Sequence, residues 1–293
     1  MEQAQQLKLQ KRCCTVGKFE SFHRGHRKLI ETAKKICSEI VVISIRGLGK
    51  KIFSEKEREE IAESLNIRLI NVPFSEIRDL TPKEFMEFLM NLGCSVLVVG
   101  SEWKFGKNRA GDVNTARKIG KSLGIEVVSV ETVKEDSEKI STSRILEFLR
   151  KGKVEEANKL LGFPYFVVGV VVKGKKLGRK IGFPTVNIET QKELPLPFGV
   201  YAVRLYLGNM VFDGISNYGR APTLKNSNPT LEVFIPEKEL PPVYGQKVKV
   251  EFFKFLRPER KFNSVEELVN QIKFDLKNLR EFWRERVGRG EEV

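Results

Sequence analysis

Residues 13–36 read Cys13-Cys-Thr-Val-Gly-Lys-Phe-Glu-Ser-Phe-His-Arg-Gly-His-Arg-Lys-Leu-Ile-Glu-Thr-Ala-Lys-Lys-Ile36. A short apolar strand over residues 13–16 leads into a loop that holds two glycines and two histidines. Apolar residues then recur at Leu29, Ile30 and onward with the spacing of one helical face. The segment therefore predicts a strand, a tight loop and an amphipathic helix, the first unit of an alternating α/β fold.

The rest of the first half repeats this pattern outward from that unit. Helices are expected to begin at two capping boxes, Ser54 to Glu57 and Thr81 to Glu84. Alternation of strands and helices predicts a parallel sheet with helices on both faces. The apolar runs that predict its further strands are residues 40–45, 68–72, 96–99 and 125–130.

The second half changes character near Gly162. Short apolar strands there are separated by glycine and proline, which favours a small antiparallel β-barrel. A long helix follows, beginning at Ser264 and running to about residue 287. We place the boundary inside residues 152–164, which gives an N-terminal domain of residues 1–158 and a C-terminal domain of residues 159–293. The expected barrel strands are residues 166–172, 200–206, 211–215, 230–235 and 247–255.

Composition narrows the class of protein. The chain has 293 residues, 41% of them hydrophobic, and it has no apolar run long enough to span a bilayer and no secretory signal. A folded cytoplasmic protein is expected, and its cysteines, which occur at positions 13, 14, 37 and 94, are expected to be free thiols. The net charge of +14 is spread over both halves, so it suits either nucleic acid or phosphate-rich small molecules.

The loop after the first strand carries the first chemical signature. His23 and His26 are the two histidines of the chain, and their spacing on a first helical turn puts both imidazoles on one side. Gly17 and Gly25 allow close approach of a ligand to the backbone. The free N–H groups of a helix N-terminus favour anions. Two structural histidines would be the plain alternative, but the pattern His-x-Gly-His at this junction favours nucleotide binding.

A second polar turn precedes a helix that is expected to end near Arg150. It reads Lys139-Ile-Ser-Thr-Ser-Arg144, which places three hydroxyls and a guanidinium at a helix start. Alone, such a turn is typical of an ordinary helix cap. There is no G-x-x-x-x-G-K-[ST] motif, so a P-loop kinase is disfavoured.

The third signature is a glycine-rich turn that enters a strand. It reads Gly174-Lys-Lys-Leu-Gly-Arg-Lys-Ile-Gly-Phe-Pro-Thr185-Val-Asn187. Its backbone and basic side chains could wrap phosphates. Thr185 and Asn187 are two residues apart and share a face of a strand, so their oxygens could bind Mg²⁺.

In this order the motifs resemble the bacterial bifunctional riboflavin kinase/FMN adenylyltransferase (FAD synthetase) family, from about residue 12 to residue 287. Further matches are Gly100-Ser-Glu-Trp-Lys-Phe-Gly106, Gly214-Ile-Ser-Asn217-Tyr-Gly-Arg-Ala-Pro-Thr223 and Leu256-Arg-Pro-Glu-Arg-Lys-Phe262. Glu20-Ser21 stands where the family usually has Asp-Gly, and Arg46-Gly-Leu-Gly-Lys50 stands where it has a Pro-His-Pro turn. The resemblance implies a Rossmann-like nucleotidyltransferase domain followed by an antiparallel β-barrel riboflavin kinase domain with a C-terminal helix.

The resemblance also implies the two reactions and the residues that carry them. ATP phosphorylates riboflavin to FMN, and a second ATP adenylylates FMN to FAD with release of pyrophosphate. Catalytic roles fall to Glu232, as the base of the kinase reaction, and to His23, His26 and Arg144 in adenylyl transfer. Magnesium is expected at Thr185 and Asn187. The expected nucleotide-binding residues are Gly17, Phe19, Gly25, Gly100, Ser141, Thr142, Ser143, Gly174, Gly178, Arg179, Gly182 and Pro184. The expected flavin-binding residues are Glu102, Phe105, Gly106, Asn217, Thr223, Arg257 and Phe262.

Two other classes of protein stay open at this point. The charge would suit a nucleic-acid-binding protein, although most of the 20 phenylalanines lie in apolar strand or helix patterns typical of a core. Another transferase with His-x-Gly-His, such as a cytidylyltransferase, would lack the riboflavin kinase motifs. The expected partners are therefore riboflavin, FMN and ATP, without nucleic acid or membrane, and the expected state is a monomer or a weak homo-oligomer.

Overall fold

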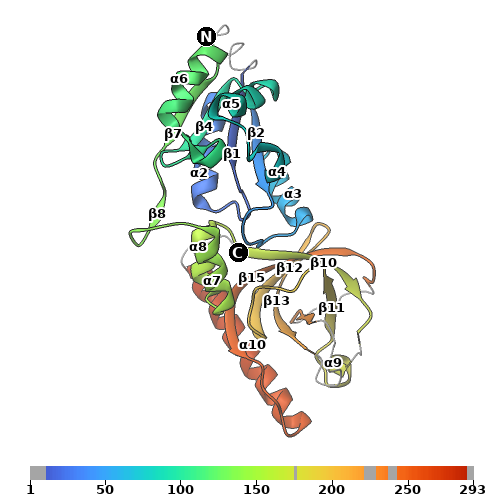
Figure 1. Ribbon diagram of the computed structural model, residues 1–293. Coiled ribbons are helices and arrows are strands. Elements are labelled where there is room, and N and C mark those ends of the chain that lie inside the picture. The colour runs from blue at the N-terminus through green and yellow to red at the C-terminus, as the bar shows by residue number, and fades with distance from the viewer. Residues whose placement is uncertain (1–10, 175–176, 221–228, 237–242, 289–293) are drawn as a thin grey trace. The chain divides into compact units, whose positions relative to one another are not determined.

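The computed structural model describes residues 11–174, 177–220, 229–236 and 243–288. The chain divides into two compact units, Met1–Arg144 and Ile145–Val293. Both units have the predicted architectures, an α/β sheet followed by a β-barrel with a C-terminal helix (Figure 1). Among the described residues, no helix combines the length and the apolar character needed to cross a membrane.

The first unit is built on a parallel sheet in the order β3-β2-β1-β4-β7. The strand order reverses between β1 and β4, because the chain moves from β1 outward to β3 and then returns to the other side of β1. In open α/β sheets, ligands bind at the carboxyl edge beside such a reversal. The strands are β1 (Arg12–Gly17), β2 (Glu39–Arg46), β3 (Arg68–Pro73), β4 (Val96–Gly100) and β7 (Glu126–Val130).

Helices cover both faces of this sheet. Apolar residues of α5 and α6 pack on the face that carries Cys14 and Val16. On the opposite face lies α2, which touches β1, β2 and β4. The helices are α2 (Arg24–Ile36), α3 (Glu55–Ser64), α4 (Phe74–Ile77), α5 (Pro82–Asn91) and α6 (Val113–Leu123).

The predicted capping boxes are present at two of these helices. Ser54 and Glu57 exchange both capping hydrogen bonds at the start of α3, and Thr81 and Glu84 do so at α5. Short hairpins that the sequence did not predict lie between the larger elements: β5 (Lys104–Phe105) with β6 (Gly111–Asp112), and β8 (Lys134–Glu135) with β9 (Glu138–Lys139); a 3₁₀ turn, η1 (Lys107–Arg109), lies between β5 and β6.

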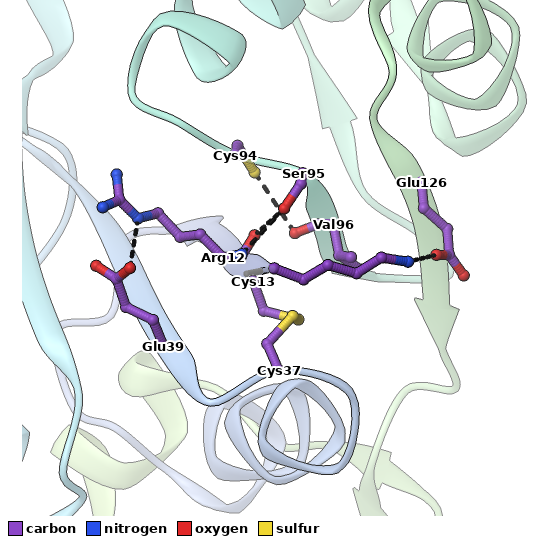
Figure 2. The surroundings of a disulfide bond; sticks show 9 residues. Arg12, Cys13, Cys37, Glu39, Cys94, Ser95, Val96 and Glu126 are labelled. Atoms are coloured by element: carbon purple, nitrogen blue, oxygen red, sulfur yellow. Dashed lines mark hydrogen bonds and ion pairs between the residues drawn. A yellow bond between two sulfur atoms is a disulfide. The ribbon is translucent and has the colours of Figure 1, made fainter. Parts of the chain in front are cut away.

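The cysteine prediction is wrong for two of the four residues. Cys13 of β1 and Cys37, which ends α2, form a disulfide with a Cα–Cα distance of 5.7 Å (Figure 2). The helix runs back along the strand, so its C-terminal end returns to the level at which β1 begins. Cys13 faces this helix, while Cys14 faces the opposite core and stays a free, buried thiol, as does Cys94.

The second unit starts at Ile145, inside α7 (Thr142–Arg150). The next helix is α8 (Val154–Leu161). Asn158 of α8 donates to the Phe252 carbonyl oxygen at 2.8 Å and accepts from the Tyr165 N–H at 2.7 Å. These bonds tie α8 to the barrel. The boundary between residues 158 and 159 stays a prediction.

In the described part of this unit, antiparallel strands close into a barrel in the order β10-β11-β14-β13-β12-β15. The long helix α10 (Val265–Gly288) packs through Leu279, Phe282 and Trp283 on β12, β13 and β15. Ser264 caps it through the Glu267 N–H, although the Glu267 carboxylate accepts from Asn263. The strands are β10 (Tyr165–Val172), β11 (Thr185–Thr190), β12 (Gly199–Leu207), β13 (Met210–Gly219), β14 (Thr230–Phe234) and β15 (Lys247–Pro258), with a short helix α9 (Leu177–Lys180) before β11.

Candidate functional site

A pocket of about 450 Å³ lies at the carboxyl edge of the parallel sheet, within the first unit. The ends of β1, β4 and β7 all reach it, as the strand reversal between β1 and β4 predicts. Residues predicted from the sequence that line it are Gly17, Phe19, His23, Gly25, His26, Gly100, Glu102, Ser141, Thr142 and Ser143. The fold therefore brings most of the predicted first site together.

The two histidines lie against each other at the start of α2. Their rings stack with centroids 3.8 Å apart, and the ring of Phe19 packs on His26 at 4.5 Å. His23 is the N-cap residue, and its Nδ1 accepts a hydrogen bond from the His26 N–H at 3.3 Å. In a neutral imidazole the other nitrogen then carries the proton, so His23 keeps Nε2–H as a donor.

Burial keeps both imidazoles neutral. Burial, together with a smaller contribution from the charge of Lys139, lowers the pKa of His23 to about 4, against a raising contribution from the residue's own backbone hydrogen bond. Burial also lowers the pKa of His26 well below its usual range, and His23 adds to this. At neutral pH the site thus offers hydrogen-bond donors rather than imidazolium charges.

Backbone conformation explains the glycines of this loop. A Cβ at Gly25 would lie 3.1 Å from the His23 ring, so the glycine leaves room for the imidazole. Phe19 and Phe22 adopt left-handed φ angles of 41° and 47° although neither is glycine. Both rings are fully buried, which holds this costly conformation in place.

Buried charged residues hold the histidine loop in position. Glu20 is buried and pairs with Arg46 at 2.8 Å. Arg58 is also buried; it donates to the Phe19 carbonyl oxygen at 3.4 Å and to the Ser44 hydroxyl at 2.6 Å. The two positions at which the sequence departs from the related family, Glu20 and Arg46, therefore contact each other.

The serine-rich turn lies beside the histidine loop. The Ser21 and Thr142 hydroxyl groups are 3.0 Å apart and hydrogen-bonded, and Ser141 caps α7 by accepting from the Arg144 N–H at 3.3 Å. The Arg144 guanidinium points to the β8–β9 hairpin: it donates to the Glu135 carbonyl oxygen at 3.0 Å and pairs with Glu138 at 3.2 Å. Arg144 is not among the residues that line the pocket.

Three predicted flavin contacts of this unit are placed differently from one another. Glu102 lines the pocket and pairs with Lys139 at 2.6 Å. Phe105 is buried in the core, where Trp103 stacks on it at 4.3 Å, and Gly106 lies against the backbone of Pro82. Of the two aromatic residues in this stretch, Trp103 lines the pocket and Phe105 does not.

Sequence reasoning missed several lining residues. The end of β7 could have been predicted, because ligands bind at the carboxyl edge of a parallel sheet. Lys18 and Trp103 lie inside two of the quoted motifs, Leu29 is on α2, and Gly49 and Lys50 come from the loop after β2. The missed lining residues are Lys18, Leu29, Gly49, Lys50, Trp103 and Val130–Val133.

The second predicted site forms a row across three strands of the barrel. Asn187 of β11 and Asn217 of β13 both lie directly opposite Glu232 of β14. Residues opposite each other in antiparallel strands share a face, and the neighbours of Glu232 on β14, Leu231 and Val233, are buried, so the row lies on the outside of the barrel. The Thr185 hydroxyl donates to the Glu232 carboxylate at 3.3 Å.

Two glycines in the described part of the glycine-rich turn lie close to neighbouring atoms. A Cβ at Gly174 would collide with the Asn187 amide, and one at Gly178 would collide with the Phe183 carbonyl oxygen. Gly182 has a left-handed φ of 86°. Arg179, in α9, is exposed, and Pro184 directly precedes β11.

The remaining predicted flavin contacts have mixed outcomes. Arg257 forms a two-point ion pair with buried Asp275 of α10, with distances of 2.8 to 3.0 Å. The Phe262 ring lies under the guanidinium groups of Arg257 and Arg260. Thr223 lies outside the described residues.

Thr185, Asn187 and Glu232 offer a hydroxyl, an amide and a carboxylate oxygen on one face. This is the set of hard oxygen donors that Mg²⁺ prefers together with phosphates. The Thr185 hydroxyl can donate its proton to Glu232 while a lone pair on its oxygen stays available. The residues thus fit a magnesium ion bound with a nucleotide.

The fold and the two candidate sites are those of a nucleotide-dependent transferase, with a pocket at the carboxyl edge of a parallel sheet in one unit and a glycine-rich turn beside a row of polar residues in the other. A sequence profile for FAD synthetase matches residues 5–144, and one for riboflavin kinase matches residues 161–283. The chain belongs to the bifunctional riboflavin kinase/FMN adenylyltransferase family.

Relatives of that description support the assignment over almost the full length. The Bacillus subtilis protein is 34% identical over 89% of this chain and 89% of its own. The Escherichia coli protein is 32% identical over 92% of each. A solved structure described as a macrolide-efflux protein from Streptococcus pneumoniae has a TM-score of 0.81 at 28% identity, covering 92% of this chain and 94% of that one.

Proposed function

We propose that the two reactions of the family are divided between the two units. The chain is a riboflavin kinase and an FMN adenylyltransferase: it makes FMN from riboflavin and FAD from FMN. We assign adenylyl transfer to the pocket of the first unit. We assign phosphoryl transfer to the row of Asn187, Glu232 and Asn217 in the second unit, together with Thr185. The observation that carries the first assignment is the stacked pair His23 and His26 in a pocket at the carboxyl edge of the sheet.

Adenylyl transfer at this pocket needs positioning and hydrogen-bond donors. An FMN phosphate oxygen attacks the α-phosphorus of ATP, and the bond from that phosphorus to the pyrophosphate oxygen breaks. The nucleophile is already anionic, so no base is needed. Neutral His23 can donate Nε2–H to phosphate, and Lys18, Lys50 and Lys139 line the pocket with positive charge.

Phosphoryl transfer needs a base, because the riboflavin 5′-hydroxyl is a poor nucleophile at neutral pH. Glu232 would accept the hydroxyl proton as the oxygen attacks the γ-phosphorus of ATP, and the bond from that phosphorus to the β,γ-bridging oxygen breaks, which releases ADP. Thr185 and Asn187 would hold Mg²⁺, which when bound neutralises phosphate charge and aligns the phosphates. Asn217, on the other side of Glu232, would orient the flavin substrate.

Separate loss of the two activities tests this division. In the full chain, His26→Ala should abolish FAD formation and leave FMN formation from riboflavin within about twofold. Glu232→Gln should abolish FMN formation and leave FAD formation when FMN is supplied. Both products are measured by chromatography after incubation with ATP and Mg²⁺. Equal loss of both activities in both variants would refute the two-site assignment.

The sequence also supports three finer expectations that stay proposals. They are the use of Mg²⁺ as the metal, a cytoplasmic location, and a monomer or weak homo-oligomer. A metal titration of both activities and the molar mass in solution test the first and the last.

A further inference from the structure

The β8–β9 hairpin contacts two of the segments that line the adenylyl-transfer pocket, the histidine segment and the serine-rich turn. Val130–Val133, directly before it, and Lys139, at its end, belong to the lining. The Glu135 carboxylate accepts from the Arg24 guanidinium at 2.6 Å, and Arg24 directly follows His23. The Glu135 carbonyl oxygen accepts from Arg144 at 3.0 Å. One residue therefore bonds to the histidine segment and to the serine-rich segment.

The turn of this hairpin is held in a costly conformation. Asp136 and Ser137 have φ angles of 53° and 64°, in the left-handed region that favours glycine or asparagine. Such residues persist where the surrounding contacts over-determine them. Those contacts include Arg144, which pairs with Glu138 at 3.2 Å and approaches the Asp136 carboxylate at 3.8 Å.

The side chain of Glu135 is more deeply buried than those of the other acidic residues of the hairpin. The side chain of Glu135 is 15% exposed, against 75% for Asp136 and 71% for Glu138. A charge-assisted bond that is shielded from water is stronger than an exposed one. A second contact, between the Ser21 and Thr142 hydroxyl groups, joins the same two segments at 3.0 Å.

We infer that Glu135 is a positioning residue for adenylyl transfer, which holds the His23–His26 and Ser141–Ser143 segments at the separation that fits the phosphates of ATP. This rests on the proposed function of the pocket. In this arrangement Arg144 holds the β8–β9 hairpin in place and does not contact the reacting atoms.

The expected signature is a change in KM without a change in kcat. When the bond is lost, the Ser21–Thr142 contact still joins the two segments, but the rest of their ordering occurs only as ATP binds, so binding bears that part of the cost. Once ATP bridges the segments, the geometry for reaction is restored. Glu135→Gln should raise the KM for ATP in FAD formation about tenfold, which corresponds to about 1.4 kcal/mol, with kcat within twofold.

The matched control is Asp136→Asn, which removes one negative charge from the same turn at an exposed position where asparagine tolerates the left-handed φ. It should leave the KM for ATP within twofold. Arg24→Gln removes the bond from the helix side and should reproduce the effect of Glu135→Gln, which keeps the test valid if one variant folds poorly. The charge-reversed pair Arg24→Glu with Glu135→Arg should recover most of the affinity.

FMN formation, which belongs to the other unit, serves as the internal standard and should be unchanged in all these variants. An equal KM in Glu135→Gln and Asp136→Asn, or a fall in kcat at constant KM, would overturn the inference. If His26→Ala abolishes FAD formation while Glu135→Gln behaves like the unchanged chain, only the role of Glu135 fails. If His26→Ala keeps FAD formation, the pocket assignment itself fails.

Discussion

The disulfide between Cys13 and Cys37 makes the stability of the first unit depend on redox conditions. The ring that it closes spans a sequence separation of 24 and contains the whole histidine loop. Closing a loop of that length lowers the entropy of the unfolded chain and so stabilises the folded state by about 3.5 kcal/mol at 25 °C. For a unit of this size, loss of that stabilisation lowers the melting temperature by roughly 10 °C.

Calorimetry of the full chain with and without a dithiol reductant measures this effect. We expect the transition of the first unit to move down by roughly 10 °C on reduction, and the barrel transition to stay in place. Cys37→Ala should melt at the lower temperature under both conditions. Cys94→Ala, a cysteine outside the bond, should keep the difference between the two conditions.

Thiol titration gives an independent check. In denaturant without reductant, the chain should show two free thiols, those of Cys14 and Cys94. Four reactive thiols, or a melting temperature that does not respond to the reductant, would refute the reasoning.

Three further predictions follow from contacts in both units. Burial lowers the pKa of His23 to about 4 and the pKa of His26 well below its usual range, so the unfolded chain binds protons at both positions first as the pH falls below 6.5. The free energy of unfolding should therefore decrease between pH 6.5 and 4, with up to about 1.4 kcal/mol per pH unit from His23 and a further contribution from His26. Urea unfolding measures this, and His23→Asn, which keeps an N-cap, should reduce the slope without abolishing it. Gly174→Ala should reduce FMN formation at least tenfold while leaving FAD formation from FMN, because the added Cβ displaces the Asn187 amide; unchanged kinase activity would contradict the metal-binding role. Arg257→Met should cost the barrel about 3–5 kcal/mol by leaving buried Asp275 without its partner; a raised KM for riboflavin with unchanged stability would instead support flavin binding.

The structure also bears on the charge of the chain. Lys18, Lys50 and Lys139 line the first pocket, but so do Glu20, Glu102 and Glu131. The net charge of +14 is therefore not concentrated at this site. It acts on anionic substrates as a diffuse field, and the local donors select them.

Much of the fold could be predicted because its signals are local. Strands of β-branched residues, capping boxes such as Ser54 with Glu57, and the change of pattern near Gly162 depend on neighbours a few residues apart. The histidine loop and the glycine-rich turn are equally compact in sequence. For this reason the two architectures and the centres of both candidate sites were visible before any coordinates.

Other features depend on residues that meet only after folding. The pairing of Cys13 with Cys37 requires α2 to run back along β1. Arg257 looked available for a ligand until α10 brought Asp275 against it.

Arg144 illustrates the same limit within the first site. The family resemblance implies a catalytic role for this residue, which the structure does not test. In the fold it turns to the β8–β9 hairpin, which has no motif and is formed by only a few residues. The sequence by itself determined which elements form and which residue types gather at the sheet edge, because those follow from local periodicity and chain direction. Only the tertiary structure decided which charged partner each side chain keeps, because a charge pairs with whatever the packing brings within reach.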